Sequence, residues 1–364
     1  MRAESTVMNE RLSPALGLPE PLRPAPDMSA QWQNVDLPYD EAANRFVERH
    51  RMDGAVRDMP VMDLRTWGVA PLGKHFALRP LAGHEPPREL RSTAFSMLCT
   101  RLGAPADFIR KLPQPLQLAL LNYLASLGDR PESAVLRIRG TEISSIVTAK
   151  YAALDAEQLV ETLRTALGRQ GLLDSVRVRA VATGITDVIR LVLPSEAVPV
   201  KVGDVSLVGL DVSSSSFAKS AIHVRGMVMR LVCTNGLRTP SSIGDLSLRH
   251  IGETQRLRDG LAEGVATALT HAWGLMGRWK ASVSQYVTNL ADYIDSLRDF
   301  SQSEQQAVRT ELGATKPSEL PTQATVYDLV NAVTHAAQSA EPARRIELES
   351  IAGNVLMNHT KGES

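Results

Sequence analysis

Basic side chains gather in the middle of this sequence. Between Val176 and Arg258 there are eleven Lys and Arg residues but only six Asp and Glu residues. The whole chain, by contrast, has 40 basic and 40 acidic residues and no net charge. Arg177 and Arg179 lie two residues apart and would share one face of a strand, whereas Arg225 and Arg230, five apart, would fall on opposite faces of a regular strand. This local excess predicts either a solvated sheet surface or a groove for nucleic-acid phosphates.

Other side chains could add to such a groove. A hydroxyl can contact a phosphate as a basic side chain does, and residues 214–216 are all serine. Aromatic residues make up only 4% of the chain, which argues against recognition by base stacking. The candidate phosphate contacts are Lys150, Arg177, Arg179, Lys219, Arg225, Arg230 and Arg238, with Ser214, Ser215 and Ser216 as weaker candidates.

Two patterns resemble catalytic motifs but lack essential parts. Gly68–His75 matches the spacing of a phosphate-binding loop, yet His75 replaces the magnesium-binding hydroxyl and Pro71 removes a backbone amide. The serine run 213–216 has no GxSxG elbow around it and is predicted to be a turn. We therefore expect no nucleotide cofactor and no serine nucleophile.

A metal site also finds little support in the spacing of possible ligands. The eight histidines are scattered, without the spacing of a zinc motif. Asp204 and Asp211 could serve a metal-dependent nuclease, but no Glu-x-Lys follows them, and turn or strand-edge roles explain them better. The prediction is a protein without metal or enzymatic activity, and a metal-dependent enzyme acting on nucleic acid remains an alternative.

Length and composition set the frame for these residues. A chain of 364 residues, 43% of them hydrophobic, is large enough for about two domains. Two cysteines exclude a disulfide scaffold and favour a reducing compartment. The sequence has no signal-peptide core and no run of about 18 apolar residues, so we expect a cytoplasmic protein that does not span a membrane.

The pattern of apolar residues predicts an α+β fold, with a central antiparallel sheet flanked by helices. Prolines punctuate residues 1–38, which we expect to be a disordered tail. Residues 39–253 are predicted to form the α+β core, because short alternating runs separated by turns favour an antiparallel meander. Residues 254–360 step by threes and fours and are predicted to be helical. In the helix expected over 254–300, an aromatic stripe could serve core packing or a subunit interface: Trp273, Trp279, Tyr286 and Tyr293.

Residues 90–358 resemble a domain family of unknown function that is common in phage and plasmid proteins. The resemblance is carried mainly by Arg-x-Val-Cys-Thr-Asn-Gly, here Arg230 to Gly236, and by the stretches 209–229, 325–335 and 349–356. Where relatives often have Asn-Ser before the serine loop, this chain has Val212-Ser213. Asn235-Gly236 favours a turn, and Cys233 is expected to be a small buried residue.

In outline the expected fold is similar to single-strand annealing proteins of the Redβ and Erf kind, an analogy at the level of fold alone. It implies ATP-independent binding and annealing of single-stranded DNA by a homo-oligomeric ring or filament, in phage or plasmid recombination or replication. The alternative is a non-enzymatic protein-interaction or regulatory module of a mobile element, which the neutral net charge and the helical C-terminal part favour.

Overall fold

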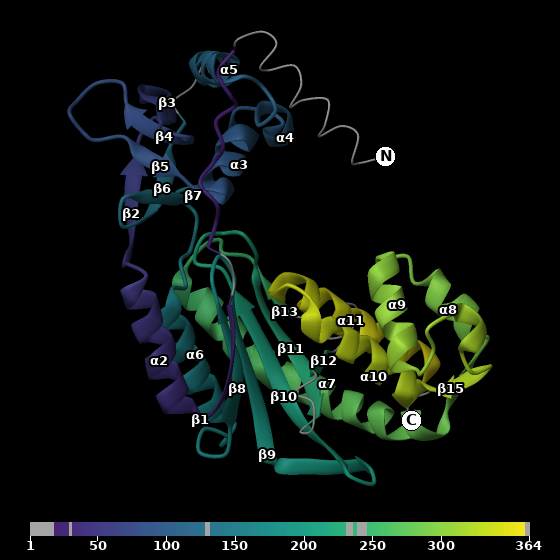
Figure 1. The fold of residues 1–364 in the computed structure, drawn as a ribbon. Coiled ribbons are helices and arrows are strands. Elements are labelled where there is room, and N and C mark those ends of the chain that lie inside the picture. Colours follow the sequence, from purple (N-terminus) through teal and green to yellow (C-terminus); the bar gives the residue numbers. More distant parts are fainter. Residues whose placement is uncertain (1–17, 29–30, 128–131, 231–235, 239–245, 361–364) are drawn as a thin grey trace. The chain divides into compact units, whose positions relative to one another are not determined.

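The computed structural model of the protein describes residues 18–28, 31–127, 132–230, 236–238 and 246–360 (Figure 1). These residues fold into helices and mainly antiparallel sheets, which confirms the α+β prediction. They divide into two compact units. Unit 1 contains Glu48–Tyr151, Phe217–Lys219 and the described part of residues 1–29, and unit 2 contains the remainder.

Unit 2 is built on a seven-stranded antiparallel sheet, in the order β1-β8-β9-β10-β11-β12, with β13 also paired to β11. A separate pair is formed by β14 (Tyr286–Thr288) and β15 (Gln323–Thr325). The strands of the large sheet are β1 (Gln31–Pro38), β8 (Arg177–Thr183), β9 (Asp187–Lys201), β10 (Asp204–Ser214), β11 (Ile222–Arg230), β12 (Gly236–Arg238) and β13 (Leu246–Leu248).

The helices of unit 2 begin where the sequence supplies capping residues. Asp155 and Ser301 each form a capping box with a side chain three residues later, which satisfies backbone amides at the helix start. The α-helices are α6 (Ala156–Arg169), α7 (Thr254–Ala281), α8 (Leu290–Ser296), α9 (Gln302–Glu311), α10 (Val326–Ala336) and α11 (Pro342–His359). Short 3-10 turns are η2 (Ser282–Ser284), η3 (Pro317–Glu319) and η4 (Ala337–Ser339).

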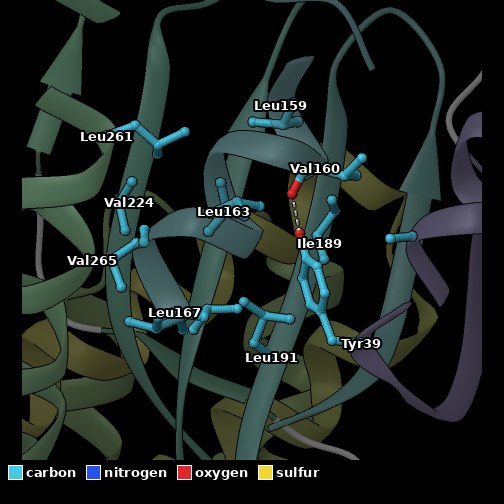
Figure 2. Close-up of a cluster of buried hydrophobic side chains, with 14 of the residues drawn as sticks. Tyr39, Leu159, Val160, Leu163, Leu167, Ile189, Leu191, Val224, Leu261 and Val265 are labelled. Atoms are coloured by element: carbon cyan, nitrogen blue, oxygen red, sulfur yellow. Dashed lines mark hydrogen bonds between the residues drawn. The ribbon is translucent and has the colours of Figure 1, made fainter. Parts of the chain in front are cut away.

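The main core of unit 2 lies between the sheet and helices α6 and α7 (Figure 2). Leu159, Leu163 and Leu167 of α6 recur every four residues and pack with Ile189 and Leu191 of β9. The first part of α2 (Tyr39–Met52) joins this core, where the hydroxyl of Tyr39 donates a 2.6 Å hydrogen bond to the carbonyl of Val160. Burial raises the pKa of this hydroxyl, which therefore remains a donor.

A second core of unit 2 joins the end of α7 to α8, α9, α10 and α11. Trp279 is buried here, stacks on Tyr327 at 4.6 Å between ring centroids, and donates its indole N–H to Ser206 of β10. Helix α7 ends at Ala281, so Tyr286 lies outside it, in β14. Its side chain is exposed. The segment predicted as one helix over 254–300 consists of two α-helices, a 3-10 turn and a strand, and its aromatic residues do not form one stripe.

Unit 1 has a six-stranded sheet with strand order β2-β6-β7-β5-β4-β3, in which only β5 and β7 pair in parallel. Its core includes a stacked pair, Phe76 and Phe95, at 4.5 Å between ring centroids. The strands are β2 (Val56–Val61), β3 (Trp67–Leu72), β4 (His75–Pro80), β5 (Arg88–Leu90), β6 (Ala134–Arg139) and β7 (Glu142–Val147). The helices are η1 (Leu64–Thr66), α3 (Ser92–Arg101), α4 (Ala106–Ile109) and α5 (Gln114–Ser126).

The predicted domain boundaries need correction in two places. The segment 39–253 is not one core around one sheet, because it contributes to two sheets in two units. The prediction of a disordered tail over 1–38 is wrong for β1, which pairs with β8, and for Ala25, which forms a bridge with Arg91. Residues 1–17 lie outside the described residues. Residues 254–360 are mainly helical, as predicted, apart from β14 and β15.

Two further predictions concern the pattern that resembles a phosphate-binding loop and the absence of a membrane-spanning segment. The segment that resembles a phosphate-binding loop runs through β3, a two-residue turn and β4, so it precedes a strand and not a helix. None of the helices within the described ranges is long and apolar enough to cross a lipid bilayer.

Candidate functional site

Two of the predicted arginines lie together at the edge of the large sheet. Arg177 and Arg179 both reach Asp36 on the neighbouring strand β1, with Nε to Oδ1 at 2.7 Å and Nη1 to Oδ2 at 2.9 Å. The hydrogen bond from Arg177 lowers the pKa of the Asp36 carboxyl, and the charge of Arg179 adds to this. The side chains of Arg177 and Arg179 remain 38% and 19% exposed, so this pair of cations is accessible from solvent.

A second group of charges is buried between the sheet and α11. We call it the buried arginine cluster, and it consists of Arg190, Arg238, Arg345, Asp211 and Glu349. Arg190 Nε donates to Asp211 Oδ2 at 3.0 Å, and its two terminal nitrogens bond both oxygens of Glu349. Arg345 Nε donates to Glu349 Oε1 at 3.0 Å. Four of the five side chains are at most 1% exposed, so the cluster is shielded from water.

The sheet determines which side chains meet in this cluster. In the register of β9, β10 and β11, Arg190 lies opposite Asp211, and Asp211 lies opposite Arg225. Arg238 arrives on β12, contacts Asp211 and approaches Glu349 Oε2 to 3.7 Å. Burial opposes ionisation of Asp211, but the positive charges of Arg238 and Arg190 outweigh it and lower the pKa of this carboxyl.

An indole ring faces two of the clustered arginines. Trp32 of β1 lies beneath Arg190 and Arg345, whose guanidinium carbons are 4.3 and 5.3 Å from the ring centroid. This cation–π contact adds to the stabilisation of both guanidinium groups. Together with the pair on Asp36, five arginines share three carboxylates in these contacts. Each of the three carboxylates is therefore bonded by two or more arginines.

The structure places the remaining candidates differently. Arg238 is only 1% exposed and is occupied inside the protein, so it is removed from the set of phosphate contacts. Arg225 is partly exposed and lies in register with Asp211. Arg230 falls on the opposite face of β11, as its spacing from Arg225 predicts, and its Nε lies 2.8 Å from Oδ2 and 3.0 Å from Oδ1 of Asp204. A largely buried cation in an apolar strand needs an anionic partner, and the partner of Arg230 is the carboxylate of Asp204.

Two lysine candidates belong to the other unit. Lys150 and Lys219 are exposed and lie in unit 1, whereas the site described above is confined to unit 2. Among the serines, Ser215 donates to the carbonyl of Ile185 and is buried, and Ser214 and Ser216 are also buried. Residues 214–216 therefore do not offer exposed hydroxyls to a ligand in this structure.

The alternative metal site has no support in the geometry. Asp204 is paired with Arg230, and Asp211 with Arg190 and Arg238, so both carboxylates already have arginine partners. Within the part of the chain that the structure describes, no three potential ligands come together in a way that could hold a metal. Residues 231–235, which carry most of the Cys-Thr-Asn-Gly motif, lie outside the described residues.

Sequence reasoning missed four members of the site that lie outside the basic stretch 176–258. Trp32 and Asp36 lie in the segment expected to be a tail, and Glu349 and Arg345 lie in a helix far along the chain. One signal was present: Arg345 and Glu349 are four residues apart, the spacing of an ion pair on a helix. That spacing identifies the pair but not its burial against the sheet.

Comparison with known proteins identifies one family and no characterised relative. A family model with the description "Domain of unknown function (DUF932)" matches residues 144–359, more than half of the chain. The match includes the whole buried arginine cluster as well as Arg177 and Arg179, but not Trp32 and Asp36. No curated protein and no solved structure matches this chain.

Proposed function

We propose that this chain, which belongs to the DUF932 family of domains of unknown function, binds single-stranded DNA and anneals complementary strands without ATP. In this proposal it works in the cytoplasm, in phage or plasmid recombination or replication. The observation that supports it is the pair of solvent-accessible arginines, Arg177 and Arg179, which share the carboxylate of Asp36 on the sheet of unit 2. Phosphates of a nucleic acid are anions that such an arrangement would attract.

The accessible arginines are the proposed contacts. Arg177 and Arg179 present their guanidinium groups beside the exposed carboxylate of Asp36, and Arg225 lies further across the sheet, opposite Asp211. Arg190, Arg238 and Arg345 act from beneath, through their charge and by holding the strands and α11 together. Lys150 and Lys219 of unit 1 are additional candidates. Annealing would follow from neutralised phosphate repulsion, with no covalent step.

Removing the two accessible arginines tests this assignment. The double variant Arg177→Gln/Arg179→Gln should bind a fluorescent single-stranded oligonucleotide roughly tenfold more weakly, because two phosphate contacts are lost. Fluorescence anisotropy at one fixed salt concentration measures this change. The matched control, Arg45→Gln/Arg298→Gln, removes the same charge from exposed positions elsewhere in unit 2. An equal loss in both double variants would mean that only net charge matters and would refute the site.

One observation favours the alternative of a protein-interaction module. On α5 and at its end, Leu116, Tyr123 and Leu127 are each more than half exposed, and their spacing of seven and four residues puts them on one stripe. A stripe without charge suits a second copy of this chain, because the same surface can pair with itself. Such contacts would also build the homo-oligomer that annealing requires.

The stripe can be tested separately from DNA binding. The variant Leu116→Ser/Tyr123→Ser should lower the molar mass measured by multi-angle light scattering, since self-association would lose its apolar contact. The control Gln114→Ser/Ser126→Ala changes the same helix without removing an exposed apolar side chain. If the mass is unchanged in both variants, this stripe is not the contact between copies.

A further inference from the structure

A pocket in unit 2 brings together charges of both signs around Arg230, apart from the buried arginine cluster. Its volume is about 560 Å³, and it lies between the end of α9, β15, one side of α10 and the last residue of β11. The polar groups in its wall are Arg230, Glu311, Gln323, Asp328, Asn331 and His335. Neither the family match nor the proposed DNA binding assigns a role to it.

Helix α10 supplies half of these polar groups because of its periodicity. Asp328, Asn331 and His335 are separated by three and four residues and therefore lie on one side of the helix. The opposite side carries Leu329 and Val333, which are buried in the second core. The core thus fixes the rotation of α10 and turns its polar side toward the pocket.

The cation in the pocket wall is held in place before any ligand arrives. Arg230 Nε bonds Asp204 at 3.0 Å, its Nη1 donates to Asn331 Oδ1 at 2.8 Å, and the guanidinium lies 5.7 Å from the ring centroid of Tyr327. The side chain of Arg230 is 18% exposed, so part of it still faces the pocket. A fixed guanidinium of this kind suits a planar carboxylate, with little entropy lost on binding.

The carboxylates in the wall are more accessible than the arginine. Asp328 accepts a 2.6 Å hydrogen bond from Thr325 and lies 3.7 Å from Lys201, while its side chain stays 43% exposed. Glu311 Oε1 lies 2.7 Å from His335 Nδ1, and the Glu311 side chain is 36% exposed. The pocket therefore contains two carboxylates that can accept hydrogen bonds from a positive group. It also contains the guanidinium of Arg230, which can donate to a negative group.

We propose that this pocket binds a small zwitterion of the α-amino-acid class. The carboxylate of the ligand would meet Arg230, and its ammonium group would lie between Asp328 and Glu311. A purely anionic ligand would be repelled by the two carboxylates, and a purely cationic one would be repelled by Arg230. The volume leaves room for a side chain as well as for these two groups. The proposal does not depend on DNA binding.

Calorimetric titration of the full chain with the proteinogenic L-amino acids, one at a time, tests this assignment. We expect at least one of them to bind with a dissociation constant in the millimolar range or below. For phenylalanine, as an example, the analogues phenethylamine and 3-phenylpropanoate each lack one of the two charges and should bind at least tenfold more weakly. Absence of binding by every amino acid would overturn the proposal, and so would an analogue that binds as well as its parent.

Variants locate the binding in this pocket. Asp328→Asn/Glu311→Gln removes both proposed ammonium partners but leaves Arg230 and its buried partner Asp204 intact, so it should weaken binding about tenfold or more. The control Asp259→Asn/Glu263→Gln removes two exposed carboxylates from α7 and should leave the dissociation constant unchanged. Equal binding by both double variants would place the amino acid elsewhere and overturn the assignment.

Discussion

Replacing Asp211 by asparagine is expected to destabilise the protein by about 3–5 kcal/mol, the cost of breaking a buried ion pair from one side. Asp211 is 1% exposed and is bonded by both Arg190 and Arg238. Without its charge, Arg190 and Arg238 would lose one of the two carboxylates that they contact in the buried cluster. Urea denaturation followed by circular dichroism measures the loss as a lower midpoint.

Asp36→Asn is the matched control for this variant. Asp36 also sits between two arginines, but its side chain is 54% exposed, so water screens both contacts. We expect this substitution to cost less than about 1 kcal/mol. A small loss for both variants would contradict the view that burial of the cluster holds α11 against the sheet. If Asp211→Asn is too unstable to purify, adding Arg238→Met should restore part of the stability, because it removes one unpaired charge.

The same carboxylate should leave a signature in the dependence of stability on pH. The arginines hold the pKa of Asp211 below its ordinary value, so its stabilising effect is present above about pH 5 and is lost as the pH falls through the folded pKa. The Asp211→Asn variant lacks this contribution. Its stability should therefore fall less steeply than that of the wild type when denaturation is repeated at decreasing pH.

The second large effect is expected at Gly226, where helix α7 crosses strand β11. A Cβ atom at this position would lie 2.5 Å from the carbonyl oxygen of Ala268 and 2.7 Å from the amide nitrogen of Ala272. Both are backbone atoms and cannot move away as a side chain would, so α7 would have to shift from the sheet. We expect Gly226→Ala to cost about 3 kcal/mol, measured by thermal or urea denaturation.

Gly274→Ala, on the same helix, serves as the control. Nothing lies within 4 Å of a Cβ at Gly274, and alanine is the better helix former, so this variant should gain about 0.5–1 kcal/mol. If Gly226→Ala is as stable as the wild type, α7 does not pack against β11 as closely as the structure has it.

The class of fold followed from the sequence because most elements have a clear periodicity. Strands such as β10 and β11 are rich in Val, Leu and Met, and α6 repeats leucine every four residues. Strand β1 was missed because it is an edge strand in which no residue is fully buried, and its sequence QWQNVDLP shows little alternation between apolar and polar residues. The prolines around it then favoured the prediction of a tail.

The length predicted about two domains, but the assignment of segments to the two units and the composition of the site were not predictable, for a different reason. Residues 217–219 belong to unit 1 although they lie between strands of unit 2, and no local pattern marks such an excursion. Arg238 looked like an accessible cation because its partner Asp211 lies 27 residues earlier and Glu349 lies 111 residues later. By contrast, Arg177 and Arg179 reach one carboxylate together, as their two-residue spacing suggested.

The most direct test of the proposed function is the salt dependence of binding to a labelled single-stranded oligonucleotide, with duplex DNA of the same sequence as the control. We expect the logarithm of the association constant to fall linearly with the logarithm of salt concentration, and the single strand to be preferred. The slope should be shallower by about 1.4 in Arg177→Gln/Arg179→Gln, since each phosphate contact on a single strand contributes about 0.7. If the wild-type protein does not bind the single strand even at low salt, the proposed function is contradicted.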